Sequence, residues 1–391
     1  MYQIQTLNKI SPVGLATLGE NYQVADTVEN PDAILVRSAV MHEMEFGSNL
    51  LAIARAGAGY NNIPFERCAE EGIVVFNTPG ANANGVKELA LAGMLLASRD
   101  VVGGINWVQT VKDEAKVSDL VEKGKSKFAG TEIKGRKLGI IGLGAIGSQL
   151  GNAAVHLGME VYGCDPYISV DAAWNLSRSI HHVKTREEIF RNCDIISVHT
   201  PLVQNPDPSI ATEKMINADT IAMMKDGVII LNFARDLLVD DDAMEAALKS
   251  GKVRKYVTDF PNAKTAGMEG VIAIPHLGAS TEDAEDNCAV MACKELVDYI
   301  ENGNIKNSVN FANAEMNAVG QKICILHKNI PAVIAPLTQM VSEAGGNIEN
   351  MVNASRKDFA YTMIDVTGAD ANAIADNMKT IDGVIRVRVI G

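Results

Sequence analysis

The sequence predicts an α/β protein with two parallel sheets, followed by a smaller antiparallel α/β unit near the C-terminus. The first observation is a glycine fingerprint at residues 142–147, which follows the apolar run 138–141 and opens a helix-like segment. The second is a series of short apolar runs over residues 1–90 and 194–276, each ending in a polar or glycine-rich tip, as buried parallel strands do. The third is a βαββαβ order over residues 322–389, which is typical of a ferredoxin-like fold.

The composition limits the class of protein. A chain of 391 residues predicts two or three domains, and 47% hydrophobic with 21% charged residues is typical of a globular protein. A net charge of −13 and a pI near 5.1 disfavour a nucleic-acid partner. No apolar run reaches about 18 residues, so we expect no membrane span. The six cysteines form no C-x-x-C pair and the chain start has no signal-peptide core, so we expect reduced thiols and a cytoplasmic location.

The glycine fingerprint predicts a dinucleotide site. Its first glycine permits a tight turn, its second lets the backbone approach a pyrophosphate, and its third lets the helix lie close to the strand. The residues expected at the phosphates are Gly142, Gly144, Ala145, Ile146 and Gly147. Asp165 ends the next apolar run, 18 residues past the last glycine, where it can bond both ribose hydroxyls. A carboxylate there repels a 2′-phosphate, so the predicted cofactor is NAD rather than NADP.

Two arginines follow neighbouring strands of the first predicted sheet. Arg37 ends the run 33–36, and Arg55 ends the run 51–54. Ligands of parallel α/β folds bind at the carboxyl ends of strands. Either arginine alone could be a solvated loop residue, but the pair favours an anionic substrate, because Arg recognises phosphate and carboxylate bidentately.

Two further strand tips carry residues suited to redox chemistry on a hydroxy acid. His276 follows a strand and a proline, and it could accept a hydroxyl proton while hydride leaves for a nicotinamide. Arg235 could hold a carboxylate and polarise a carbonyl. We interpret His199 as structural, and His181-His182 has no neighbouring metal-ligand pattern, so no metal is expected.

The connecting segments are expected to be simple. The pattern of residues 85–106 predicts one long, mostly buried helix, and that of residues 281–301 predicts a second long helix. Residues 111–137 are interpreted as a solvated lysine-rich arm, or alternatively as an arm that lends a cation to an active site. Residues 302–318 are rich in Asn and begin with Asn-Gly-Asn, and they are interpreted as a linker.

Five stretches carry a resemblance to a known family: residues 36–38, 54–59, 142–147, 232–235 and 275–281. Together the chain resembles the D-isomer-specific 2-hydroxyacid dehydrogenases, in the short form with a C-terminal ACT domain. The resemblance implies a Rossmann-type NAD-binding domain inserted in a flavodoxin-like substrate domain, followed by a ferredoxin-like ACT domain. The implied boundaries are 1–95 with 280–312 for the substrate domain, 96–279 for the NAD domain, and 318–391 for the ACT domain.

The resemblance also implies an activity, which is NAD-dependent oxidation of 3-phosphoglycerate to 3-phosphohydroxypyruvate in serine biosynthesis. It makes Arg235 the carboxylate-binding residue, His276 the acid–base, and Arg37, Arg55 and Asn82 substrate contacts. Further cofactor contacts are implied at Thr200, Pro201, Phe233, Ala234, Asp259 and Gly278, with Asp259 holding the nicotinamide amide. His327, Asn329 and Asn347 would bind an L-serine effector, and paired ACT domains would make a homodimer or homotetramer.

One departure from the family pattern keeps other functions open. The family places a Glu four or five residues after the position of Asp259, bonded to the catalytic His, whereas here those positions are Ala263 and Lys264. Asp236 also replaces a Gly and could attract Arg235. We therefore expect His276 to be less well oriented and a weaker acid–base. The alternatives are a catalytically weak regulatory protein that binds serine and NAD, and a dehydrogenase for another 2-hydroxy acid.

Overall fold

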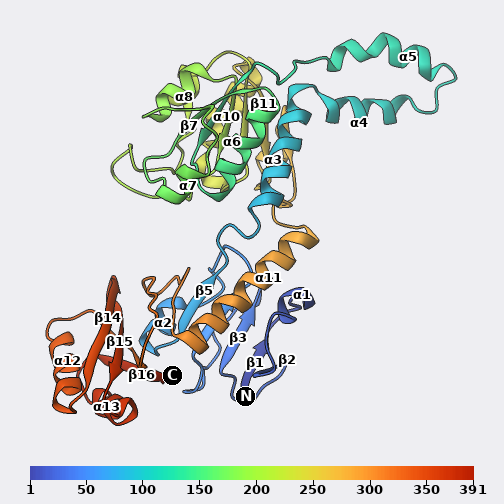
Figure 1. Ribbon diagram of the computed structural model, residues 1–391. Helices are drawn as coiled ribbons and strands as arrows, with labels where there is room; N and C mark the ends of the chain where they lie inside the picture. Colours follow the sequence, from blue (N-terminus) through green and yellow to red (C-terminus); the bar gives the residue numbers. More distant parts are fainter. The chain divides into compact units, whose positions relative to one another are not determined.

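The computed structural model describes residues 1–391 apart from the side chain of Asp171. The chain divides into two compact units, each built around a parallel sheet (Figure 1). The first unit comprises residues 1–82 and 282–391, and the second comprises residues 83–281. No helix formed by the described residues combines the length and the hydrophobicity needed to cross a bilayer.

The first unit contains a parallel five-stranded sheet in the order β2-β1-β3-β4-β5, which is the flavodoxin-like order. Its strands are β1 (Tyr2–Thr6), β2 (Tyr22–Ala25), β3 (Ala33–Val36), β4 (Ala52–Arg55) and β5 (Val74–Asn77). Its helices are α1 (Pro12–Leu15), α2 (Phe65–Glu70) and α11 (Glu282–Val297), which a π-helical turn extends to Asn302. Val36 is in register with Arg55, so β3 and β4 end side by side.

The second unit contains a parallel seven-stranded sheet in the order β12-β11-β10-β9-β6-β7-β8, which includes the six-strand Rossmann order. Its strands are β6 (Lys137–Ile141), β7 (Glu160–Cys164), β8 (Ile180–His182), β9 (Ile195–Val198), β10 (Val228–Asn232), β11 (Val253–Thr258) and β12 (Val271–Ala273). Its helices are α3 (Ala83–Ser98), α4 (Val101–Val111), α5 (Val117–Gly124), α6 (Ala145–His156), α7 (Val170–Trp174), α8 (Arg186–Asn192), α9 (Ala218–Met223) and α10 (Asp241–Ser250). Short 3-10 turns lie at 125–128, 236–238 and 265–267.

The prediction of one buried helix over residues 85–106 is wrong. The helix ends at Ser98, and the Asp100 side chain accepts a hydrogen bond from the Gly103 amide at 3.3 Å, which starts α4 as a new helix. No residue of α4 is buried, and Ile105 is 56% exposed. Figure 1 shows α4 and α5 extending away from the seven-stranded sheet of their unit. An apolar helix is therefore left on the surface of the chain.

The C-terminal part of the first unit forms the expected ferredoxin-like βαββαβ fold, with an antiparallel sheet in the order β14-β15-β13-β16. Its elements are β13 (Gln321–Lys328), α12 (Ile334–Glu343), β14 (Asn347–Arg356), β15 (Phe359–Thr367), α13 (Ala371–Met378) and β16 (Val384–Ile390). One face of this sheet packs on α12 and α13. The other face contributes Cys324, Tyr361 and Met363 to the same hydrophobic core as Phe76 of β5 and Tyr299.

The segment expected to be a linker, residues 302–318, is instead part of that core. Phe311 is fully buried, and the Asn310 carbonyl oxygen Oδ1 accepts a hydrogen bond from the Val75 amide at 3.0 Å. The polar composition indicated a loop, but it did not indicate that Asn310 and Phe311 attach this segment to the core.

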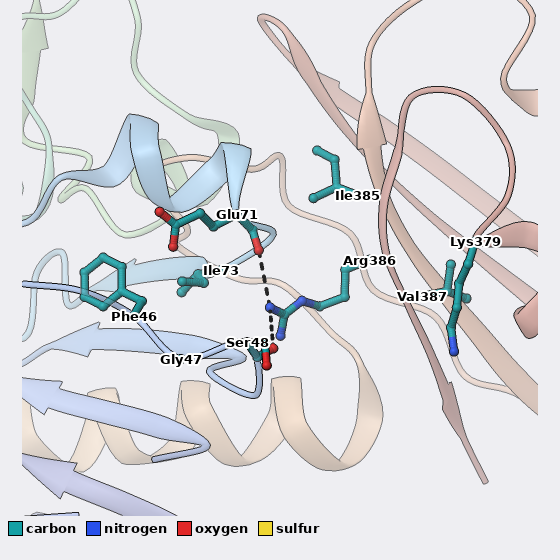
Figure 2. A pocket seen from close by; sticks show the side chains of 9 residues that line it. All are labelled: Phe46, Gly47, Ser48, Glu71, Ile73, Lys379, Ile385, Arg386 and Val387. Carbon is teal, nitrogen blue, oxygen red and sulfur yellow. Dashed lines mark hydrogen bonds between the residues drawn. The ribbon is translucent and has the colours of Figure 1, made fainter. Parts of the chain in front are cut away.

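Cations of the ferredoxin-like sheet bind main-chain carbonyls of the rest of the first unit. The Arg386 guanidinium donates to the Leu50, Ser48 and Glu71 carbonyls at 2.7, 3.1 and 3.3 Å, and Figure 2 shows it reaching the latter two. Arg388 donates to the Ile300 carbonyl at 2.7 Å, near the C-terminal end of the α11 helix. These bonds fasten the sheet in place beside a cleft of about 510 Å³.

Candidate functional site

The glycine loop has the geometry expected for a dinucleotide site. Gly142 has a φ of +93°, and a Cβ there would lie 2.5 Å from the His199 carbonyl oxygen. A Cβ at Gly147 would lie 2.0 Å from the Gly142 oxygen, so only glycine lets the helix approach the strand. Nothing lies within 4 Å of a Cβ on Gly144, which leaves that face of the loop open. Ala145 and Ile146 follow as the first residues of α6.

Asp165 lies beside this loop, directly after β7. Its Oδ2 accepts a hydrogen bond from the Leu143 amide at 2.8 Å, and its Oδ1 accepts one from the Tyr167 amide at 2.9 Å. Two backbone donors thus hold the carboxylate at the carboxyl edge of the sheet, where the ribose of a dinucleotide lies in such folds.

Three polar atoms that follow β9 and β11 are buried without a hydrogen-bond partner among the described residues: Thr200 Oγ1, His199 Nδ1 and Asp259 Oδ1. Unpaired buried polar atoms are costly, so a ligand that bonds them is favoured. Burial raises the pKa of Asp259, and its Oδ2 accepts from the Gly278 amide at 3.2 Å. A Cβ on Gly278 would lie 2.9 Å from that oxygen. The residues present therefore fit NAD.

His199, which was interpreted as structural, is buried beside the expected cofactor residues. The Ser197 hydroxyl lies 2.8 Å from His199 Nε2, and burial lowers the pKa of His199 to about 4, so the ring is neutral. Phe233 and Ala234 follow β10 and are buried, whereas Pro201 is exposed.

The two residues predicted to carry the chemistry both lie near one aromatic ring, that of Phe260, which the sequence patterns did not indicate. The His276 ring centroid lies 4.5 Å from that of Phe260, and the Arg235 guanidinium carbon lies 5.8 Å from the same centroid. His276 has a φ of +37°, and its amide donates to the Asp259 and Ile274 carbonyls, both at 3.0 Å. Arg235 Nη1 donates to the Ala234 carbonyl at 2.6 Å. Phe260 therefore brings Arg235 and His276 together in the second unit.

In the loop that departs from the family pattern, the side chains bind residues other than His276. Lys264 Nζ pairs with Asp242 and Glu245 of α10. The Asn262 side-chain amide donates to Asp236 at 3.0 and 3.2 Å, so this carboxylate is engaged away from Arg235. Ala263 is exposed between them. The cation at position 264 is thus directed toward α10.

In the first unit, Arg37 and Arg55 form a pair at the ends of β3 and β4. Arg55 Nε donates to the Arg37 carbonyl at 3.0 Å. A Cβ on Gly57, whose φ is +152°, would lie 2.0 Å from Arg55 Nη1, so the arginine covers a glycine that has no room for a side chain. Burial, with the charge of Arg37 added, lowers the pKa of Arg55. A partly buried cation beside another cation favours an anion as ligand.

Two residues that no sequence pattern indicated, Asn8 and Glu285, contact this pair or its loop. The Asn8 side-chain oxygen accepts from the backbone amides of Arg37, Ser38 and Ala39 at 3.0, 2.8 and 2.9 Å, which fixes the loop after β3. Glu285 of α11 pairs with Arg37 at 2.5 Å. Asn82, the third predicted substrate contact, is the last residue of the first unit before α3 begins.

The expected effector residues do not meet within one chain. His327 is buried at the end of β13, with its Nε2 2.9 Å from Thr362 Oγ1. Asn329 lies at the same end of the sheet and donates to the Lys357 carbonyl at 2.9 Å. Asn347 pairs in register with Thr367 at the opposite end of the sheet. A site that uses all three residues would need two chains.

Comparisons with known proteins agree with this geometry. The sequence profile of the D-isomer specific 2-hydroxyacid dehydrogenase NAD binding domain matches residues 91–278. D-3-phosphoglycerate dehydrogenase from Haemophilus influenzae is 32% identical over 363 residues, which are 89% of this chain and 83% of that protein. Hydroxypyruvate reductase from Thermotoga maritima is 34% identical over 293 residues, which are 72% of this chain and 87% of that protein.

A solved structure is similar as well. NAD+-bound 3-phosphoglycerate dehydrogenase from Entamoeba histolytica has a TM-score of 0.60 and 26% identity, covering 81% of this chain and 99% of that one. The predictions of the fold and of NAD as cofactor are confirmed. The chain therefore belongs to the D-isomer specific 2-hydroxyacid dehydrogenases, and it is an NAD-dependent dehydrogenase.

Proposed function

We propose that the protein oxidises 3-phosphoglycerate to 3-phosphohydroxypyruvate. The observation that carries this proposal is the arginine pair Arg37–Arg55, which provides a second cationic site besides Arg235. 3-Phosphoglycerate is a 2-hydroxy acid with both a carboxylate and a phosphate. Arg235 is suited to the carboxylate, and the pair is suited to the phosphate.

In the proposed reaction His276 accepts the proton of the substrate hydroxyl; NAD, when bound, would supply the acceptor for the hydride. Arg235 orients the carboxylate and stabilises the charge that develops on the carbonyl oxygen. Phe260 holds both side chains by ring contacts. The proposal includes the binding roles predicted above for the other substrate and cofactor residues. It also includes the predicted division into substrate, NAD-binding and ACT domains.

The experiment measures NADH oxidation with 3-phosphohydroxypyruvate, hydroxypyruvate and pyruvate as rival substrates. We expect the highest kcat/KM with the phosphorylated compound. Arg55→Gln should remove most of this preference, whereas Lys306→Gln, which removes a charge from an exposed pair with Glu315, should keep it. Equal kcat/KM values for the three substrates with the parent protein would refute the proposal.

A second candidate is a regulatory protein that binds NAD and serine but turns over slowly. The observation that favours it lies in the loop where the family has the Glu that supports the catalytic His. Here Lys264 pairs with α10, and Asn262 donates a hydrogen bond to Asp236. If the parent protein has the same kcat as His276→Ala, the result supports this second candidate.

We further propose a homodimer or homotetramer with serine bound between paired ACT domains. The separation of Asn347 from Asn329 in one chain and the exposed apolar helix α4 support association of copies. The six cysteines are all free and buried, which supports a cytoplasmic location. Sedimentation of the protein with and without L-serine tests the association.

A further inference from the structure

The N-terminal turns of α11 bring one carboxylate to the arginine pair. Glu285 Oε1 lies 2.5 Å from Arg37 Nη2, and the two side chains are 44% and 40% exposed. Cys288, one turn further along the helix, lies near the same arginines, but burial raises the pKa of its thiol, so it stays neutral. Of these two helix residues, only Glu285 therefore brings negative charge to the pair.

The Glu285 carboxylate pairs with Arg37, the guanidinium that the proposed function assigns to the phosphate of the substrate. An ion pair with both partners partly in water contributes little free energy, and its exposure lets a solute reach it. A phosphate group carries up to two negative charges and three strong acceptor oxygens, so it forms stronger bonds with Arg37 than one carboxylate does. The Arg37–Glu285 pair is thus arranged for replacement by a phosphate.

We propose that Glu285 is a specificity-determining residue, an internal counter-ion that holds Arg37 until the phosphate of the substrate displaces it. This inference rests on the proposed function, because it takes the phosphate to bind at Arg37 and Arg55. The carboxylate neutralises one of the two guanidinium groups while no substrate is bound, and it competes with a phosphate group for Arg37. Binding of a phosphorylated substrate consequently includes breaking this pair.

The test compares Glu285→Gln with the parent for 3-phosphohydroxypyruvate and hydroxypyruvate. Removing the competing charge should lower KM for the phosphorylated substrate about fivefold, which corresponds to about 1 kcal/mol, the upper end for exposed ion pairs. The kcat for both substrates and the KM for hydroxypyruvate should not change. Asp283→Asn is the matched control, because it removes one charge from the first turn of the same helix and Asp283 is in no ion pair of the described side chains.

Each outcome decides the matter. An unchanged or higher KM in Glu285→Gln, with an active parent, would show that Glu285 positions Arg37 or is irrelevant to it, and would overturn the inference alone. An equal fall in KM with Asp283→Asn would show a general charge effect, with the same consequence. A parent that neither turns over 3-phosphohydroxypyruvate nor binds 3-phosphoglycerate by calorimetry would overturn the proposed function, and the inference with it.

Discussion

Glu295 of α11 should make the first unit less stable as pH rises, although it takes no part in the proposed reaction. The side chain is 8% exposed, its Oε1 accepts a hydrogen bond from Asn307 at 2.8 Å, and its Oε2 is buried without a partner among the described residues. Burial raises the pKa of Glu295 from an ordinary 4.5 to about 8. The folded protein therefore keeps a proton on this carboxyl that the unfolded chain releases.

The sign of the effect follows from this difference in bound protons. Below pH 4.5 both states are protonated and the group costs nothing, whereas between pH 4.5 and about 8 the native state binds more protons and stability falls. At about 1.4 kcal/mol for each pH unit, the full cost above pH 8 is at most about 5 kcal/mol. Between pH 6 and pH 8 the change is about 2 kcal/mol, because the folded group is already half ionised at pH 8.

Glu295→Gln tests this reasoning, because glutamine keeps the acceptor for Asn307 and does not ionise. Urea denaturation followed by circular dichroism at pH 6 and pH 8 measures the free energy of unfolding. The advantage of the variant over the parent should grow by about 2 kcal/mol over this range. Glu282→Gln, at an exposed position of the same helix, should show a constant difference. A constant difference for Glu295→Gln as well would mean that the folded protein already ionises this carboxyl.

Three further predictions concern the chemistry. Asp165→Ala should weaken NAD binding and narrow the difference between NAD and NADP in a fluorescence titration; equal affinities of the parent for both cofactors would contradict it. His276→Ala should lower kcat by about 10² to 10⁴, whereas Arg235→Ala should also raise KM, because it removes a ground-state contact; steady-state kinetics separate the two. Ala263→Glu should move the limb of the pH–rate profile to higher pH if the loop approaches His276, and an unmoved limb would exclude that approach.

The parts of the fold that were predictable are those whose signal is local in sequence. The turn at Gly142 needs a positive φ, and strand tips such as Arg37 follow directly from apolar runs, so both could be recognised without a structure. The break before α4 could not, because its apolar residues look like a buried face and only the structure shows them exposed.

The unpredicted parts of the site depend on contacts between distant segments. Phe260 belongs to no motif in the sequence, and only the structure shows its ring against His276 and near Arg235. Glu285 lies in the segment 281–301 that was predicted to be a long helix, but its pairing with Arg37 depends on how α11 crosses the sheet. Sequence patterns predict what each segment forms, but not which side chains from separate segments come into contact.

The shared hydrophobic core has a consequence for how the chain can be divided. A domain that folds independently has its own hydrophobic core, so separating it from its neighbour exposes mainly polar surface on both parts. Here a cut before residue 318 would expose Phe76, Tyr299 and Phe311 on one fragment, and Tyr361 and Met363 on the other. Both fragments would expose apolar side chains that are buried in the intact chain. The C-terminal ferredoxin-like part therefore depends for its packing on the rest of the first unit.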